Sequence, residues 1–383
     1  MTRYVIALSE LGIKNNNLIS LLLEHSHEIE EIFDTKSNYV FDSNLDLMSY
    51  YDIFSNKTLV SEALEKADAI LKRNEELGIK TTYYTSQTYP MELSKIDNPP
   101  AIIYYKGSEF NNISDKSIAC VGTRKPTKLS YNVANYLIPQ WVKENCSIIS
   151  GLACGVDKIS HQACISAKGK TIAVLAHGLD TIYPKENSSL ADRIIEADGI
   201  LMSEYPIGTK PDKFRFVNRN RLIVGLSKAI VIMECDAKGG TIHNVEYAIK
   251  QQKPIFCPAL GEEITEIQTG TKQLIDNKIA TVIQQGRDIS SVLDAVGVGI
   301  TKERMDNLQI KYNYLHAILS IIHSPIILEA TIRDLQLNIP VCNDMYTTFI
   351  NLLNEKQVHI DKLISTLVEN NIAYINKTLS FND

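Results

Sequence analysis

The feature that most constrains the fold is a regular alternation between about residues 110 and 290. Short apolar runs alternate there with longer segments whose apolar residues recur every three or four positions. The runs are "SIACVGT", "SIISGLA", "TIAVLAHG", "ILMSEYP", "AIVIMEC" and "PIFCPAL". Uniformly apolar strands separated by helices are typical of a parallel sheet covered on both faces. We therefore expect an α/β fold with an extended Rossmann-like sheet, which binds its ligands at the carboxyl ends of the strands.

The segments on either side of this core have a different pattern. Residues 1–80 carry apolar residues at helical spacing, which predicts a small helical (SAM-like) domain with Gly78 as a helix stop. Short β-rich runs begin near Thr81, so we expect the Rossmann-like domain over residues 81–295, with one of its helices at 219–227. Residues 300–383 have helical patterns and a final hairpin-like segment, which predicts a small, mostly helical, winged-helix-like domain.

The composition is that of a globular, cytoplasmic protein. No apolar run approaches the roughly 20 residues needed to cross a bilayer, and the N-terminus lacks the basic flank and cleavage site of a signal peptide. None of the seven cysteines forms a CxxC pair, so we expect buried free thiols rather than disulfides or a zinc site. The net charge of −6 argues against a surface that is basic throughout, but it is compatible with a local basic groove.

Small residues follow the first three strands of the predicted core. The turn residues are Gly122, Thr123 and Arg124 after the first strand, Ser150 and Gly151 after the second, and Gly178, Leu179 and Asp180 after the third. Glycines let a phosphate approach backbone N–H groups at a helix N-terminus, and an arginine adds charge. Any tight strand-to-helix turn requires glycine, but three such turns on one rim indicate an anion site. Neither GxGxxG nor GxxxxGK[ST] is present, so a dinucleotide or a hydrolysed nucleoside triphosphate is not indicated.

The stretch from Tyr205 to Lys228 concentrates positive charge in an acidic chain. It holds six lysines and arginines against one acid, Asp212, a local balance of +5. The basic residues are Lys210, Lys213, Arg215, Arg219, Arg221 and Lys228, with Phe214 and Phe216 among them. Guanidinium groups bind phosphates in a bidentate manner, and an exposed aromatic ring gives a base a stacking surface. The stretch indicates a groove for single-stranded nucleic acid, unless its phenylalanines are core residues and its charges are simply solvated.

Two histidines in the core are interpreted as structural. Asp157 and His161 lie four residues apart on one predicted helix, a spacing that metal and acid–base sites also use. No further histidine or carboxylate follows at ligand spacing, so a structural hydrogen bond or a helix cap is favoured. His177, beside Gly178, is interpreted in the same way. We predict no catalytic residue, no metal site and no cofactor.

Ordered motifs between Tyr89 and Ala259 resemble the DNA processing protein A family, called DprA or Smf. They are "YPMELSKIDNPPAIIYYKG", "VGTR", "SGLACGVDKISH", "TIAVLAHGLDTIYPKEN", "GILMSEYP" and "FVNRNRLIVGLS". The resemblance implies a bacterial, non-enzymatic protein that binds single-stranded DNA as a homodimer. It also implies a recombination mediator that protects DNA and helps to load the RecA recombinase onto DNA covered by single-strand binding protein, as in natural transformation (competence).

The resemblance implies roles for individual residues as well. Arg124 matches the arginine of the family's "VG[ST]R" turn, which contacts phosphate. Lys213 and Phe216 match a lysine that binds the DNA backbone and a phenylalanine that meets a base. The turn from Gly178 to Asn187 matches a segment that lines the family's binding pocket.

The "RNR" motif and two departures from the family pattern leave alternatives open. Arg219 and Arg221 match the family's arginine pair, which either contacts DNA or holds the turn into the following helix. Val217 stands where the family has a proline, and Glu246 stands where it has a small residue. Glu246 aligns with the catalytic glutamate of related phosphoribohydrolases, which release bases from nucleoside monophosphates. A nucleotide-binding or phosphoribohydrolase-like protein on the same fold is therefore the alternative, although the phosphate-binding motif of those enzymes is incomplete here.

Overall fold

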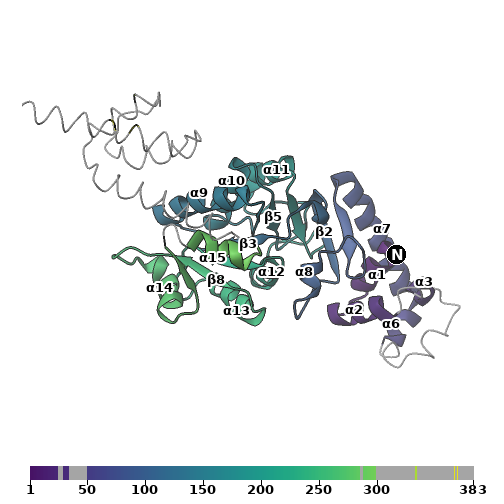
Figure 1. The fold of residues 1–383 in the computed structure, drawn as a ribbon. Coiled ribbons are helices and arrows are strands. Elements are labelled where there is room, and N and C mark those ends of the chain that lie inside the picture. The colour runs from purple at the N-terminus through teal and green to yellow at the C-terminus, as the bar shows by residue number, and fades with distance from the viewer. Residues whose placement is uncertain are drawn as a thin grey trace, which may run out of the picture. The chain divides into compact units, whose positions relative to one another are not determined.

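The computed structural model describes residues 1–24, 29–33, 50–284 and 288–298, together with Arg333, Thr366 and Glu369. A nine-stranded sheet forms the centre of this part of the chain (Figure 1). Its strands are β1 (Lys80–Tyr83), β2 (Ile102–Gly107), β3 (Ser117–Val121), β4 (Ser147–Ser150), β5 (Thr171–Val174), β6 (Ile200–Ser203), β7 (Ala229–Ile232), β8 (Ile255–Pro258) and β9 (Thr281–Ile283).

The order in which successive strands are added to the sheet reverses at β3. The order across the sheet is β1-β2-β6-β5-β4-β3-β7-β8-β9, so β3 lies between β4 and β7. The strands from β6 to β9 are parallel, whereas β1 and β2 form an antiparallel edge. Every side chain of β3 to β8 is buried, as expected for a parallel sheet with both faces covered. The predicted α/β class and Rossmann-like sheet are confirmed, with a switch point at β3.

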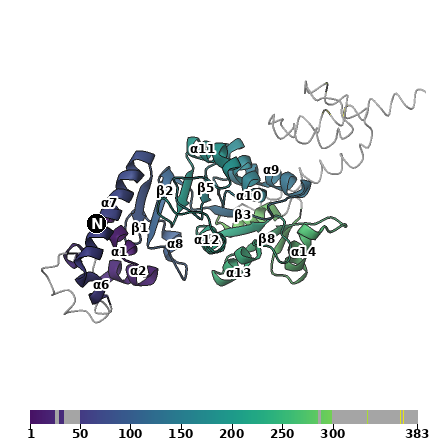
Figure 2. The same ribbon diagram turned by 180° about the vertical axis from the view of Figure 1, so that it is seen from behind.

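Helices cover both faces of this sheet (Figures 1 and 2). One face carries α9 (Lys128–Lys143), α10 (Val156–Ser166) and α11 (Ser188–Glu196), and the opposite face carries α12 (Lys213–Gly225) and α13 (Ile242–Lys250). The other helices of the core are α8 (Met91–Ser94), α14 (Thr269–Asp276) and α15 (Asp288–Ala295), with the 3-10 turns η1 (Phe110–Asn112), η2 (Lys185–Asn187) and η3 (Glu266–Gln268). Among the described residues, no helix is long and apolar enough to cross a membrane.

Helix α12 corrects one sequence-based expectation. The helix was expected over 219–227, but it begins six residues earlier, at Lys213. Asp212 is its N-cap, and its carboxylate accepts a hydrogen bond from the backbone N–H of Phe214 at 2.8 Å. The basic residues from Lys213 to Arg221 therefore lie on a helix, so that successive side chains point to different sides.

The N-terminal region is helical, as predicted. Its helices are α1 (Thr2–Glu10), α2 (Asn15–Glu24), α3 (Ile29–Ile32), α6 (Tyr51–Ser55) and α7 (Lys57–Leu77). Gly78 ends α7 with φ of +65°, which confirms it as the helix stop. The helices share one apolar cluster with β2 and α11, and the Asn15 side chain bonds the Pro99 carbonyl and the Ala101 N–H (2.5 and 2.7 Å).

Residues 1–284 and 291–298 thus form one compact unit. Because the N-terminal helices share an apolar cluster with the sheet, the domain boundary near residue 80 stays a prediction. The predicted C-terminal domain, residues 300–383, lies outside the described residues apart from Arg333, Thr366 and Glu369.

The cysteines behave largely as expected. Five are buried free thiols: Cys120, Cys146, Cys164, Cys235 and Cys257. Burial raises the pKa of Cys146 to about 12 and that of Cys235 to about 11, so both stay protonated at neutral pH. The expectation is wrong for Cys154, which is exposed, because it lies in the open loop between β4 and α10. Cys342 lies outside the described residues.

The structural interpretation of Asp157 and His161 is confirmed. The Thr171 hydroxyl donates to the Ile148 carbonyl (2.7 Å), so it accepts from Nδ1–H of His161, also at 2.7 Å. The Asp157 carboxylate accepts from the N–H groups of Gly151 and Ala153 at 3.2 and 3.3 Å, which caps the loop before α10. In the described part of the chain, no three His, Cys, Asp or Glu side chains gather as a metal-binding group.

His161 makes the stability of the fold depend on pH. Its side chain is fully buried, and burial lowers its pKa from 6.5 to about 3. The unfolded chain binds a proton at this position below pH 6.5 while the folded chain does not, so stability is lost as pH falls from about 6.5 to about 3. We expect His161 to contribute a slope of about 1.4 kcal/mol per pH unit in that window. Urea unfolding at several pH values measures it, with His161→Gln as the control that is less stable but has a flatter pH profile; equal slopes would contradict the assignment.

Candidate nucleic-acid interface

The loop that carries Arg124 is held tightly at the carboxyl end of β3. The Thr123 N–H donates to the Glu234 carbonyl at 2.7 Å, and the Val156 N–H donates to the Thr123 carbonyl at 3.1 Å. Gly155 has φ of +82°, and a Cβ there would lie 2.3 Å from the Thr123 carbonyl oxygen. Only glycine fits this conformation and this close approach. The loop is therefore packed against the start of α10, and Arg124 projects from it as an exposed side chain.

Arg124 contacts one aromatic ring, Phe216, which in turn contacts a second, Tyr183. Its guanidinium carbon lies 5.6 Å from the centroid of the Phe216 ring, within cation–π range. The Tyr183 ring lies 5.7 Å from Phe216 at 47° between the ring planes. Arg124 follows β3, Tyr183 lies between β5 and α11, and Phe216 is on α12, so the fold brings three distant segments together. We call these three residues the rim cluster.

Lys213 begins α12 one turn before Phe216. Residues three apart lie on the same side of a helix, so Lys213 and Phe216 share a side of α12. Lys213 is exposed, and it stands at the N-terminal end of α12, where the helix dipole also favours an anion. Phe214, two residues before Phe216, points to another side of α12 and is 75% exposed. The rim cluster and Lys213 together form a cationic, aromatic surface at the carboxyl edge of the sheet.

Arg219, by contrast, is buried beneath this surface. Its Nη1 donates to the Gly151 carbonyl at 2.7 Å and also to the Val174 carbonyl. Burial lowers the pKa of Arg219 to about 10, and the neighbouring Asp157 carboxylate acts in the opposite direction. Its guanidinium carbon lies 5.9 Å from the Phe216 ring. Arg219 therefore ties α12 to the ends of β4 and β5, which favours the scaffold alternative for this residue.

Arg221 is also a buried scaffold residue. It forms an ion pair with Glu204, just after β6, and the two side chains are 6% and 11% exposed. Its carbonyl accepts from the Gln251 side chain at 3.1 Å, so Arg221 links α12 to the end of α13 as well. A buried arginine that is already paired with a glutamate is poorly placed to bind a phosphate. The geometry therefore favours a role for Arg221 in holding α12 over a role in contacting DNA.

The remaining predicted residues shape the three rim turns. A Cβ on Gly122 would lie 2.6 Å from the Val156 side chain, and the Ser150 hydroxyl, fully buried, donates to the Cys120 carbonyl at 2.6 Å. The Gly178 N–H donates to the Thr209 carbonyl at 3.0 Å. Leu179 is buried and Asp180 is exposed; the latter's carboxylate accepts from the Gly208 N–H at 2.9 Å.

Glu246, the basis of the alternative function, lies on the surface of α13. Its carboxylate pairs with His243 at 3.0 Å, and both side chains are substantially exposed, at 64% and 41%. A catalytic glutamate is normally placed against a bound substrate in a site that excludes water. The exposed contact with His243 provides no such enclosure in the described structure.

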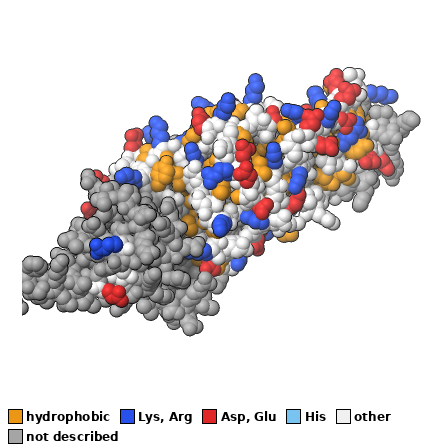
Figure 3. Space-filling model, turned by 90° about the horizontal axis from the view of Figure 1, so that it is seen from above, with side chains coloured by type: hydrophobic (Ala, Val, Ile, Leu, Met, Phe, Trp, Pro, Cys, Tyr) orange, Lys and Arg blue, Asp and Glu red, His pale blue; other side chains and the backbone are white. Residues whose placement is uncertain are grey.

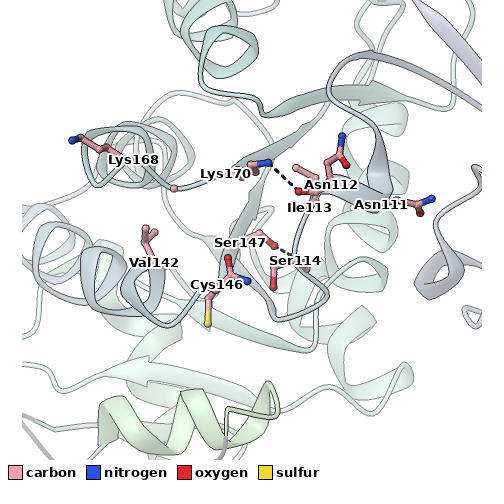
Figure 4. A pocket seen from close by; sticks show the side chains of 11 residues that line it. Asn111, Asn112, Ile113, Ser114, Val142, Cys146, Ser147, Lys168 and Lys170 are labelled. Atoms are coloured by element: carbon pink, nitrogen blue, oxygen red, sulfur yellow. Dashed lines mark hydrogen bonds between the residues drawn. The ribbon is translucent and has the colours of Figure 1, made fainter.

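A polar pocket of about 330 Å³ opens at the opposite, amino-terminal edge of the sheet (Figure 4). Figure 4 shows Lys170 reaching Asn112, whose carbonyl accepts from its Nζ at 3.1 Å, with Ser114 and Ser147 below. The pocket is lined by segments that precede β3, β4 and β5. Because ligands of open α/β sheets bind at the carboxyl ends of the strands, the rim cluster and not this pocket is the candidate site.

On the one face shown in Figure 3, the surface charge is mixed. The face covered by α9, α10 and α11 is seen from above in Figure 3, where basic and acidic side chains alternate without one continuous basic patch. This face therefore adds no second continuous basic surface to the one at the rim.

Sequence reasoning missed Tyr183 as a member of the site. The residue lies within the turn from Gly178 to Asn187, which was named as a segment, but no spacing rule pairs it with Phe216. Glu234 was missed as well, because its partners Thr127 and Ser130 lie more than a hundred residues earlier in the chain and Gln268 lies 34 residues later. An apolar run that ends in a glutamate, "AIVIME", is the only local signal of a buried carboxylate.

Comparisons with known proteins show the family of this chain. The family model for DNA recombination-mediator protein A matches residues 80–294. The chain belongs to this family. DNA processing protein DprA of Bacillus subtilis is 37% identical over 225 residues, which make up 57% of this chain and 75% of that protein.

Two solved structures of the family are similar to this chain. The X-ray structure of DNA processing protein A from Streptococcus pneumoniae has a TM-score of 0.60 at 28% identity, and the match covers 76% of this chain and 98% of that one. DNA processing protein A from Helicobacter pylori has a TM-score of 0.50 at 28% identity, covering 56% and 96% of the two chains. The Helicobacter pylori protein has a single-stranded DNA binding mode, which is the subject of its solved structure.

Substitution of Gly151 tests whether Arg219 is a scaffold residue. A Cβ at Gly151 would lie 2.2 Å from Arg219 Nη1, so Gly151→Ala must displace the guanidinium from its two carbonyl partners. We expect a loss of about 2–4 kcal/mol in the free energy of unfolding, because a buried charge loses its hydrogen bonds. Gly240→Ala is the matched control, since a Cβ there meets nothing within 4 Å. Chemical denaturation measures both, and a neutral Gly151→Ala would contradict the scaffold assignment.

Proposed function

We propose that the chain binds single-stranded DNA at the carboxyl edge of its sheet and acts as a recombination mediator. The observation that carries the proposal is the rim cluster: Arg124, Tyr183 and Phe216 meet at the switch-point edge, one helical turn from the exposed Lys213. Cations beside aromatic rings suit a strand whose phosphates and bases are both accessible. Membership of the DNA recombination-mediator protein A family supports the same function.

The phosphates are assigned to Arg124 and Lys213. Both side chains are exposed, and Arg124 extends from a loop fixed at Thr123. The bidentate guanidinium of Arg124 and the helix N-terminus at Lys213 are two independent means of binding an anion. Gly122, Thr123, Ser150, Gly151, Gly178, Leu179 and Asp180 contribute by shaping the rim. Arg219 and Arg221 act beneath the surface.

The bases are assigned to the aromatic side of the rim cluster. Phe216 is half-buried, with the Arg124 guanidinium against its ring, whereas Tyr183 is 48% exposed. A base that stacks on Phe216 must share the ring with Arg124, so we extend the stacking surface to Tyr183. Phe214 faces another side of α12 and is not part of this surface.

The wider role follows the family. We propose that the protein works without catalysis in the bacterial cytoplasm, as a homodimer, and helps to load RecA onto DNA covered by single-strand binding protein. The alternative of a nucleotide-binding or phosphoribohydrolase-like protein rests on Glu246, and its exposed pairing with His243 gives that alternative little support.

Charge reversal at the rim tests the phosphate assignment. Arg124→Glu with Lys213→Glu is expected to lower the affinity for single-stranded DNA at least a hundredfold at physiological salt. Two fewer phosphate contacts also reduce the slope of log K against log salt by roughly 1.4 for a single strand. The control is Lys66→Glu with Lys72→Glu, two exposed lysines of α7 that give the same change in net charge. Titrations of single- and double-stranded DNA at several salt concentrations measure the effect, and the proposal fails if both double variants bind alike.

Substitution of Tyr183 tests the base assignment. Tyr183→Ala is expected to lower the affinity for an oligonucleotide by about 5- to 150-fold, because one stacked base contributes about 1–3 kcal/mol. An abasic oligonucleotide should bind the wild type and Tyr183→Ala almost equally, since it has no base to stack. Fluorescence anisotropy gives both affinities. Phe214→Ala is the aromatic control and should keep wild-type affinity. A loss from Phe214→Ala that exceeds the loss from Tyr183→Ala would assign stacking to the other side of α12.

A further inference from the structure

Glu234 is a fully buried acid at the edge of a surface proposed to bind anions. It lies two residues beyond β7, and its side chain is inaccessible to solvent. Its carboxylate accepts hydrogen bonds from the Thr127 N–H at 2.8 Å, the Thr127 hydroxyl at 2.6 Å and the Gln268 amide at 2.7 Å, and from the Ser130 hydroxyl. None of the ion pairs found among the described residues includes Glu234. Four neutral donors therefore replace water around this carboxylate.

The position of this carboxylate is the N-terminus of α9. Thr127 is the N-cap of α9, where its hydroxyl accepts from the Leu129 N–H at 3.1 Å, and Ser130 lies in the first turn. Helix α9 follows β3, the strand at which the order of the sheet reverses. In doubly wound sheets, the first helix N-terminus at the switch point is where a nucleotide phosphate binds. Here an acidic side chain of the protein itself lies at that place.

Glu234 also holds both ends of the Arg124 loop. Its backbone carbonyl accepts from the Thr123 N–H, and its carboxylate binds the N–H and hydroxyl of Thr127. The three residues between these anchors are Arg124, Lys125 and Pro126. Gln268, on η3, supports the carboxylate from the far side and accepts from the Thr265 N–H at 3.1 Å. One buried residue thus connects the loops that follow β3, β7 and β8.

We propose that Glu234 is an internal anion that takes the place of a ligand phosphate at the N-terminus of α9. In that place it excludes nucleotide phosphates from the switch point, because a second anion would meet both an occupied set of donors and a like charge. It is also a positioning residue that directs Arg124 outward, towards the phosphates of an extended strand. The positioning of Arg124 rests on the proposed function, whereas the exclusion of nucleotide phosphates does not.

Removing the carboxylate tests the exclusion of phosphate. Glu234→Ala leaves the donors of Thr127, Ser130 and Gln268 without a partner, in a space that inorganic phosphate or formate can enter. We expect either anion, exchanged for chloride at constant ionic strength, to raise the Tm of Glu234→Ala by about 3 to 5 °C. The wild type and Glu246→Ala, which loses an exposed acid, should show no such increase. An equal rise in all three proteins, or none in Glu234→Ala, overturns the proposal.

An isosteric variant covers the case in which Glu234→Ala does not fold. Glu234→Gln keeps the volume but turns an amide N–H towards donors, so it cannot satisfy all four hydrogen bonds. We expect at least tenfold faster hydrogen exchange for the amides of Thr123 to Ser130, with exchange in β4 and β5 unchanged. Wild-type exchange rates across that loop would show that Glu234 does not hold it.

A double-mutant cycle tests the positioning of Arg124. If Glu234 acts on DNA through Arg124, Glu234→Gln should weaken single-stranded DNA binding about tenfold in the wild type and in Lys213→Ala, but not in Arg124→Ala. An equal loss in both single-variant backgrounds assigns Glu234 a general structural role and rejects the positioning. If the wild type binds no single-stranded DNA, the proposed function fails, while the anion and exchange measurements still decide whether Glu234 fills the site.

Discussion

The buried guanidinium of Arg219 fixes the relation between α12 and the sheet. It reaches from α12 to the carbonyls of Gly151 and Val174, at the ends of β4 and β5. A Cβ at Gly151 would occupy the same space, so this contact depends on a glycine that follows β4. Because Phe216 lies one turn before Arg219 on α12, the same contact determines where Phe216 meets Arg124 and Tyr183. The surface of the rim is thus set by a cation beneath it.

This arrangement divides the positive charge of the 205–228 stretch into two uses. Arg219 is buried and donates hydrogen bonds to carbonyl oxygens, whereas Arg221 is buried in an ion pair with Glu204 and Lys228 pairs with Glu92 at 2.8 Å. Lys210 and Lys213 are exposed. Adjacent residues of a helix point in directions about 100° apart, so one basic run supplies both a scaffold and a surface. The acidic net charge of the protein is compatible with this, because the exposed cations of the rim are few and local.

The sheet and the three rim turns could be predicted from the sequence, because uniformly apolar strands and their following glycines are local signals. The start of α12 could not be placed, since a cationic and aromatic first turn lacks apolar periodicity and its N-cap is a single aspartate, Asp212. For a similar reason, the sequence alone could not tell which arginines of the stretch are buried and which are exposed. Arg219 finds its partners 68 and 45 residues away, and no spacing rule joins such distant segments. Tyr183 and Phe216 are likewise distant in the chain, and only the folded structure brings their rings together.

Two groups suited to an anion lie at the switch point of this sheet, and one is enclosed whereas the other is exposed. The N-terminus of α9 faces inward and is filled by the Glu234 carboxylate, so its dipole serves the protein's own loop. Arg124, which stands between the two anchors of that loop, faces outward beside Phe216. An enclosed phosphate site suits a single small nucleotide, whereas an exposed arginine next to aromatic rings suits a polymer that extends past the site in both directions. If Glu234 fills the first site as proposed, the second is left rigid and open, which would suit a fold of the nucleotide-binding type to a strand of DNA.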